Sequence, residues 1–127
     1  MRDLEEAESW LDAAKFTLGN TSKGLSRFTV AVAQSIHALI KANDALTMRF
    51  LSRRSTRHED AALMFGTLVK QNKIDPKYSG FRALLTKASA EKSEYDYKGT
   101  EVGQEEAKKW IRDAEKFTKS VRELLGL

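Results

Sequence analysis

Four arginines gather around one helix junction and are the strongest candidates for chemistry in this sequence. They are Arg49, Arg53, Arg54 and Arg57, and no acid lies between Thr47 and His58. A guanidinium is planar, and its N–H groups fit pairs of phosphate oxygens and stack on bases. The cluster therefore indicates a contact with RNA, DNA or a nucleotide. The alternative is that these arginines cap the preceding helix and pair with acids elsewhere in the fold.

Arg53 and His58 form a second candidate, because four residues separate them. Nearby arginines disfavour a protonated imidazole, so a neutral His58 could act as a general base. The arginines would hold a phosphate while His58 takes the proton of a ribose 2′-hydroxyl. The alternative is that His58 is an exposed residue in the first turn of a helix.

Two tyrosines, Tyr95 and Tyr97, lie in an unusual segment, Lys92 to Lys98, where they flank an acid between terminal lysines. Tyrosines can stack on bases and donate hydrogen bonds to phosphate. They can equally pin a loop onto the body of the protein. Both roles stay open for Tyr95 and Tyr97.

Three polar residues interrupt the apolar pattern of the longest helical segment. His37 has no second histidine or carboxylate three or four residues away that would complete a metal site, so we expect a partly buried residue that donates to a neighbouring helix. Asn43 could fix a register or a dimer contact, or face a polar cleft. We expect Asp44 to be a surface ion-pair residue.

Several classes of chemistry find no support in the sequence. It contains no cysteine, which excludes disulfides, thiolate metal sites and cysteine nucleophiles. It also contains no glycine-rich phosphate loop, HExxH, GxSxG or EF-hand pattern. We therefore expect no metal site and no cofactor.

The elements that must position these residues are helices. Apolar residues recur three and four positions apart, and a single proline with seven glycines leaves little turn chemistry for a sheet. The pattern predicts helices over about 3–18, 25–51, 57 to the turn at 72–76, 79–90 and 104–125, with loops at 20–24 and 92–103. Thr56 and Glu59 have capping-box spacing at the start of the third helix. We expect Trp10, Ile36, Leu39, Phe65, Trp110 and Phe117 to be buried.

Length and composition are those of one globular domain. The chain has 127 residues, 41% hydrophobic and 31% charged, with a net charge of +4. We therefore expect a single all-α domain over residues 1–127, an up-and-down bundle of four to five helices. No apolar run is long enough for a membrane helix, and the acidic start is unlike a signal peptide, so we expect a cytoplasmic protein.

Three segments in this order resemble the HEPN family of small helical proteins. They are AESWLDAAKFTL at 7–18, AVAQSIHALIKANDALTMRFL at 31–51 and the region from Lys92 to Leu125, which ends in EEAKKWIRDAEKFTKSVRELL. The resemblance implies a helical bundle that usually forms a homodimer. Many members are metal-independent RNases, whose motif is an Arg followed after four to six residues by a His. Others lack the motif and act as binding modules, or partner a small nucleotidyltransferase, as in toxin–antitoxin-like systems.

The sequence departs from the catalytic members at one place. Their motif usually lies just ahead of the closing helix, where this chain has Lys92 to Lys98, without Arg or His. The literal match at Arg53 and His58 lies earlier, before the third helix. The leading hypothesis is a non-catalytic module that binds nucleic acid, a nucleotide or a nucleotidyltransferase-like partner. The second is an RNase that uses Arg53 and His58.

Overall fold

The computed structural model describes residues 2–97 and 102–127, and the side chains of 2–91 and 102–127. This part of the chain contains five α-helices and no strand. They are α1 (Arg2–Gly19), α2 (Ser26–Leu51), α3 (Asp60–Lys70), α4 (Phe81–Tyr97) and α5 (Gln104–Leu124). Single 3₁₀ turns at Thr21–Lys23 and Pro76–Tyr78 precede α2 and α4. The all-α bundle expected from the periodicity is confirmed.

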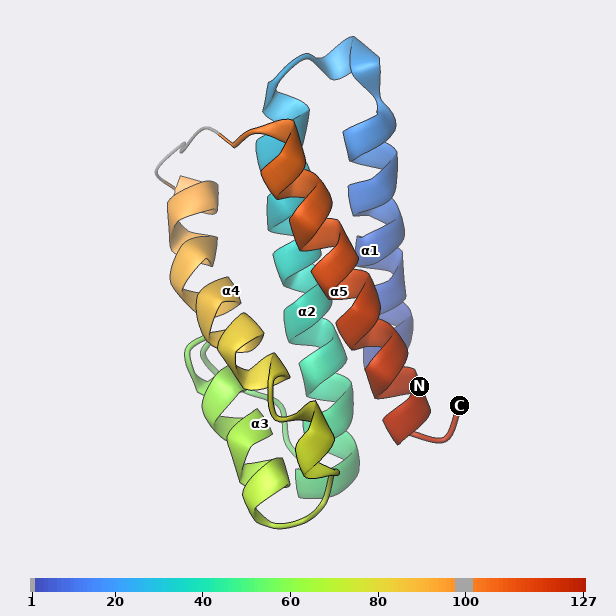
Figure 1. Cartoon of the computed structure of the whole chain (residues 1–127), viewed down its shortest axis with the longest axis vertical. Coiled ribbons are helices and arrows are strands. Elements are labelled where there is room, and N and C mark those ends of the chain that lie inside the picture. The colour runs from blue at the N-terminus through green and yellow to red at the C-terminus, as the bar shows by residue number, and fades with distance from the viewer. Residues whose placement is uncertain (1, 98–101) are drawn as a thin grey trace.

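Helix α2 is the central element of the bundle and packs against each of the other four helices. In Figure 1, α1, α2, α4 and α5 run along the long axis, and the short α3 lies beside the lower end of α2 and α4. The broad apolar face of α2 explains this position. All of its large apolar side chains are buried or half-buried except Val30, so the other helices of the bundle cover this face.

The core contains five of the six residues expected there. Ile36, Leu39, Phe65 and Phe117 are fully buried, and Trp110 is nearly so. The expectation for Trp10 is wrong, because its side chain is 37% exposed. Trp10 lies at the edge of the apolar face of α1. One face of its ring stacks on His37 of α2, with 4.6 Å between the ring centroids, and much of the rest of the ring faces solvent.

Two predicted helix boundaries are also wrong. Helix α3 begins at Asp60 rather than near Arg57, and the capping box of Thr56 and Glu59 does not form. In a capping box Thr56 would be the N-cap and Glu59 the third residue of the helix, but here Glu59 itself directly precedes the helix and no side chain caps it. Helix α4 continues to Tyr97, so part of the loop expected at 92–103 is helical. No glycine or proline interrupts residues 81–97, and the sequence therefore allows the helix to continue.

None of the helices in the described part of the chain combines the length and the apolar character needed to cross a membrane.

Candidate functional site

The arginine cluster lies at the end of α2 and on the segment that follows it, residues 52–59. Ser52 ends the helix with a left-handed backbone (φ 58°), and its N–H donates to the carbonyl of Met48. The segment then turns back along α2. Ser55 donates both its N–H and its hydroxyl to Oδ1 of Asp44, at 3.4 and 3.2 Å. Residues 52–59 are therefore attached to the helix that they follow.

Arg54 is held by the carboxylate of Asp3, in the first turn of α1. Its Nε donates to Asp3 Oδ1 and Oδ2 at 3.0 and 3.1 Å, and its Nη2 lies 2.9 Å from Oδ2. The hydrogen bond with Asp3 raises the pKa of Arg54 above its usual value. Because the Asp3 carboxylate is almost fully buried, this pair ties the 52–59 segment to α1. Arg54 thus has a structural partner within the fold, while its side chain stays 44% exposed.

Arg57 also has acidic partners, although on the surface. Its Nε and Nη2 donate to Asp60 at 3.3 and 3.4 Å, and its Nη1 lies 3.5 Å from Glu59. The hydrogen bond with Asp60 raises the pKa of Arg57. These acids follow the cluster in sequence, as the alternative interpretation of the arginines anticipated.

Arg49 and Arg53 complete the cluster. Both side chains are exposed, and neither forms an ion pair within the described part of the chain. All four arginines are therefore exposed, but two of the guanidiniums are paired with acids and the other two have no ion pair within the described residues.

His58 lies on the same exposed segment as Arg53. Its backbone carbonyl accepts a hydrogen bond from the Ser89 hydroxyl of α4 at 2.5 Å, which fixes this end of the segment against the bundle. Tyr95 and Tyr97 lie in the last turns of α4, and their side chains fall outside the described residues. The structure thus places Arg53 and His58 on one segment and leaves the tyrosine contacts as predictions.

The polar residues of α2 have structural roles. Asp44 is 6% exposed rather than a surface residue, and burial raises its pKa despite the hydrogen bonds from Ser55. Asn43 is fully buried, and its Nδ2 donates to the Ala61 carbonyl at 3.0 Å, which fixes the start of α3 against α2. His37 is half-buried, as expected, and stacks on Trp10. Sequence reasoning placed Asp44 wrongly because helical periodicity does not reveal that residues 52–59 fold back over it.

Lys41 joins the same polar region to α1. Its Nζ lies 2.9 Å from Glu6 Oε2 and 3.6 Å from Asp3 Oδ1. The hydrogen bond between Lys41 and Glu6 raises the pKa of Lys41 and lowers the pKa of Glu6. Two cations, Lys41 and Arg54, therefore neutralise the buried Asp3 carboxylate.

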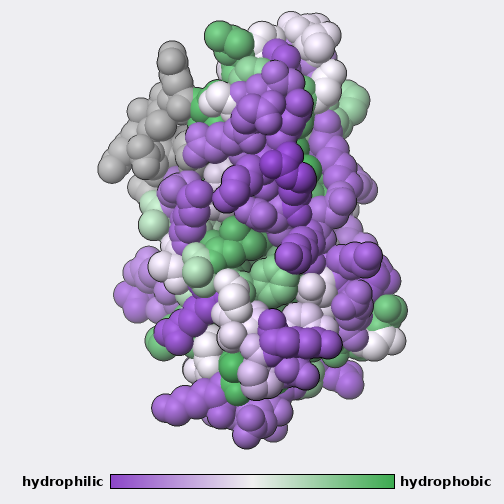
Figure 2. All heavy atoms as spheres, in the orientation of Figure 1, coloured by the Kyte–Doolittle hydropathy of each residue, from purple (hydrophilic) through white to green (hydrophobic). Residues whose placement is uncertain are grey.

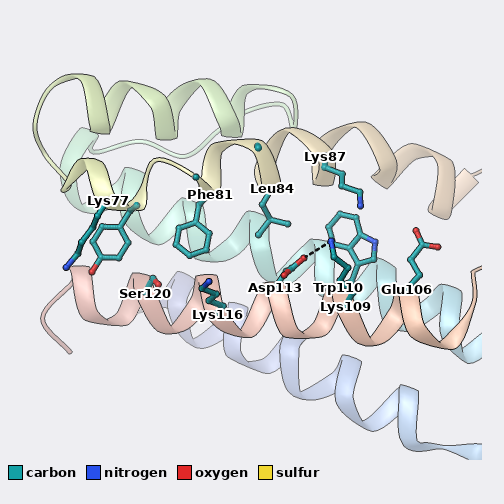
Figure 3. Close-up of a pocket in the computed structure, with 13 residues that line it drawn as sticks. Lys77, Phe81, Leu84, Lys87, Glu106, Lys109, Trp110, Asp113, Lys116 and Ser120 are labelled. Atoms are coloured by element: carbon teal, nitrogen blue, oxygen red, sulfur yellow. Dashed lines mark ion pairs between the residues drawn. The ribbon is translucent and has the colours of Figure 1, made fainter.

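A groove between α4 and α5 was not anticipated from the sequence. It has a volume of about 690 Å³, and Figure 3 shows the side chains that line it. Its apolar residues include Phe81, Leu84 and Trp110, of which Trp110 was expected in the core. The available signal was the pair Lys109 and Lys116, two turns apart on α5 and beside that apolar stripe.

No group of three or more His, Asp or Glu residues in the described part of the chain could hold a metal ion.

A family model described as HEPN domain matches residues 2–124. No curated protein and no solved structure matches the chain. The family match spans nearly the whole sequence and agrees with the resemblance carried by its three helical segments.

Proposed function

Because the chain belongs to the HEPN domain family, we propose that it is a non-catalytic module that binds single-stranded RNA through the surface formed by Arg49 and Arg53. The observation that supports this most is the division of the arginine cluster. Arg54 and Arg57 have acidic partners, whereas Arg49 and Arg53 are exposed without an ion pair in the described residues. Two exposed guanidiniums at one helix end suit the phosphates of a flexible strand.

The placement of the motif residues supports a module without cleavage. Catalytic members of the family carry Arg and His just ahead of the closing helix, and this chain has neither at positions 92–103. The alternative remains a metal-independent RNase that uses Arg53 and His58. Arg53 and His58 are both exposed on one segment, which is the observation in favour of the RNase alternative.

Salt dependence of RNA binding tests the proposed surface. Each phosphate contact on a single strand contributes about 0.7 to the slope of log affinity against log salt concentration. We expect Arg49→Ala/Arg53→Ala to weaken binding and to reduce this slope by about 1.4, because two contacts are lost. Fluorescence anisotropy with a labelled single-stranded RNA over a salt series measures both quantities.

The matched control removes the same charge elsewhere. Lys23 and Arg112 are exposed and lie outside the 49–58 region, so Lys23→Ala/Arg112→Ala should retain most of the slope. Equal losses in the two double variants would show that RNA senses only net charge, and the proposed surface would then be wrong.

Cleavage separates the two candidate functions. The unmutated protein should leave labelled RNA intact in the presence of a chelator. If it cleaves, and His58→Ala lowers the rate by about 10²–10⁴-fold while binding is retained, the RNase alternative is correct.

A homodimer and a nucleotidyltransferase-like partner are further proposals that rest on membership of the family. Sedimentation at tens of micromolar protein should reveal a dimer, in which a twofold axis would relate the two Arg49–Arg53 surfaces. Sedimentation as a monomer alone would contradict the dimer. If RNA does not bind even at low salt, a protein partner becomes the leading candidate.

A further inference from the structure

The groove between α4 and α5 is a second, separate place where a ligand could bind. Figure 2 shows apolar side chains between hydrophilic ones on this face, over the two helices labelled in Figure 1. In Figure 3, Phe81 and Leu84 of α4 point toward α5, opposite the row from Glu106 to Ser120. These α5 positions span about 20 Å along the helix axis. The volume of about 690 Å³ lies within the range of small-molecule sites.

The charge at the rim of the groove is positive. Four lysines line it, Lys77, Lys87, Lys109 and Lys116, against two acids, Glu106 and Asp113. The Nζ of Lys109 lies 3.7 Å from Oδ2 of Asp113. A dashed line marks this ion pair in Figure 3. Within the described chain, no carboxylate pairs with the other three lysines. An occupant that carries a negative charge would therefore be favoured.

Trp110, which lines the groove, has a buried polar atom without a hydrogen-bond partner in the described residues. Its indole Nε1 is buried and has no hydrogen-bond acceptor in the described residues. The Nζ of Lys87 lies over the ring, 5.0 Å from the centroid. A buried donor without an acceptor is costly, so an oxygen atom that reached the indole N–H would be stabilised there, and the Lys87 ammonium over the same ring favours an anionic one.

The lining contains few neutral polar groups that could recognise a base or a sugar. Apart from Tyr78 and Ser120, the side chains that line the groove are apolar, cationic or carboxylate. A nucleoside would leave much of its polar edge without partners in such a site. An aliphatic or aryl body would instead be buried favourably against Phe81, Leu84 and Trp110.

We propose that this groove binds an anionic amphiphile, a small molecule with an apolar body and one carboxylate or phosphate head. The body lies along Phe81 and Leu84, and the head lies among the unpaired lysines. This site differs from the surface of Arg49 and Arg53 in position and in the ligand that it takes.

Dodecanoate, below its micelle concentration, is the probe for this proposal. Trp10→Phe leaves Trp110 as the only tryptophan, so its fluorescence reports occupancy of the groove. We expect a saturable change with dodecanoate and a much weaker one with acetate or dodecanol, which lack the body or the charge. Calorimetry on the unmutated protein provides the stoichiometry, expected to be one per chain.

Two matched variants locate the binding. Ala83 is exposed and lines the groove, whereas Ala90 is exposed on the same helix and does not. Ala83→Glu should weaken dodecanoate binding by about tenfold through charge repulsion, and Ala90→Glu should leave it nearly unchanged. Both positions are on the surface, and circular dichroism would verify that both variants fold.

Three results would overturn the proposal. The first is no saturable binding of dodecanoate. The second is equal weakening by Ala83→Glu and Ala90→Glu, which would indicate non-specific association. The third is tighter binding of ATP than of dodecanoate with the same sensitivity to Ala83→Glu, which would assign the groove to a polar nucleotide.

Discussion

Asp44 places a carboxylate inside the bundle, where two donor groups of Ser55 reach it and the Lys41 ammonium attracts it. Burial has the larger effect, and it raises the pKa of Asp44 above its usual value of 3.8. Like-charged Asp3 acts in the same direction. The carboxylate therefore resists ionisation in the folded protein more than in the unfolded chain.

This leads to a prediction for the pH dependence of stability. The folded state holds the Asp44 proton more tightly, so the contribution of Asp44 to the free energy of unfolding falls as pH rises from 3.8 through the raised pKa. We expect Asp44→Asn to remove this fall, because an amide oxygen can still accept from Ser55 without a charge. Relative to the variant, the unmutated protein should lose stability over that pH window.

Urea unfolding of both proteins across a pH series measures the difference. The comparison with the variant is needed because Glu6, whose pKa is lowered, contributes in the opposite direction as pH falls. A difference that does not vary with pH would show that Asp44 titrates normally in the fold.

Residue roles were predictable where neighbours in sequence decide them and not where the tertiary fold does. The identities of Arg49, Arg53 and His58 as surface candidates followed from local spacing. The pairing of Arg54 with Asp3 did not, because it joins residues 51 positions apart. Burial of Asp44 likewise depends on the path of residues 52–59.

At the scale of elements, the end of α3 shows how a change in backbone geometry terminates a helix. Helix α3 ends at Lys70, and Asn72, two residues later, has a left-handed backbone (φ 57°). The N–H of Asn72 donates to Val69, and that of Lys73 donates to Leu68 at 2.9 Å. This pair of bonds is a Schellman motif, in which asparagine is tolerated and glycine is preferred.

Substitution at Asn72 should therefore change stability in two directions. Asn72→Gly should raise the free energy of unfolding by a few tenths to about 1 kcal/mol, because glycine adopts positive φ without strain. Asn72→Val should lower it by about 1–2 kcal/mol. Urea denaturation measures both values.

The neighbouring residue provides the control. Gln71 has an ordinary φ of −86°, so Gln71→Gly should bring no gain. Equal stabilisation by glycine at 71 and 72 would refute the assignment of strain to Asn72.

Helix existence was more predictable than helix length. The three-four spacing identified all five helices, since each must cover one side of the core. The three-four spacing could not place the end of α4, because residues 92–97 are helical but mostly polar, and a polar segment shows no apolar periodicity. It also could not exclude the Thr56–Glu59 capping box, which does not form because α3 begins only at Asp60.

At the scale of the whole molecule, one aromatic cluster joins α3, α4 and α5. The Phe117 ring packs against Phe65 at 6.0 Å and against Phe81 at 5.0 Å between centroids. Phe65 and Phe117 are fully buried. Since these rings come from three helices, their loss affects the bundle rather than one element.

Phe117→Ala should lower the free energy of unfolding by about 3–5 kcal/mol, because it removes a buried ring and leaves a cavity. Phe16→Ala is the control, since Phe16 is 74% exposed and should change stability little. Chemical denaturation followed by circular dichroism measures both. A loss below about 1 kcal/mol for Phe117→Ala would place that face of α5 outside the core.

The pair formed by Asp3 and Arg54 has a consequence for local unfolding. Movement of Arg54 away from the bundle breaks its pair with Asp3 in the first turn of α1, and fraying of α1 at that turn breaks the same pair. In amide hydrogen exchange, the two regions should therefore open as one cooperative unit. An anion that immobilises Arg53 would then slow exchange near Asp3, which it does not touch. Amide exchange in the first turn of α1 would thereby report anion binding at Arg53, some fifty residues further along the chain.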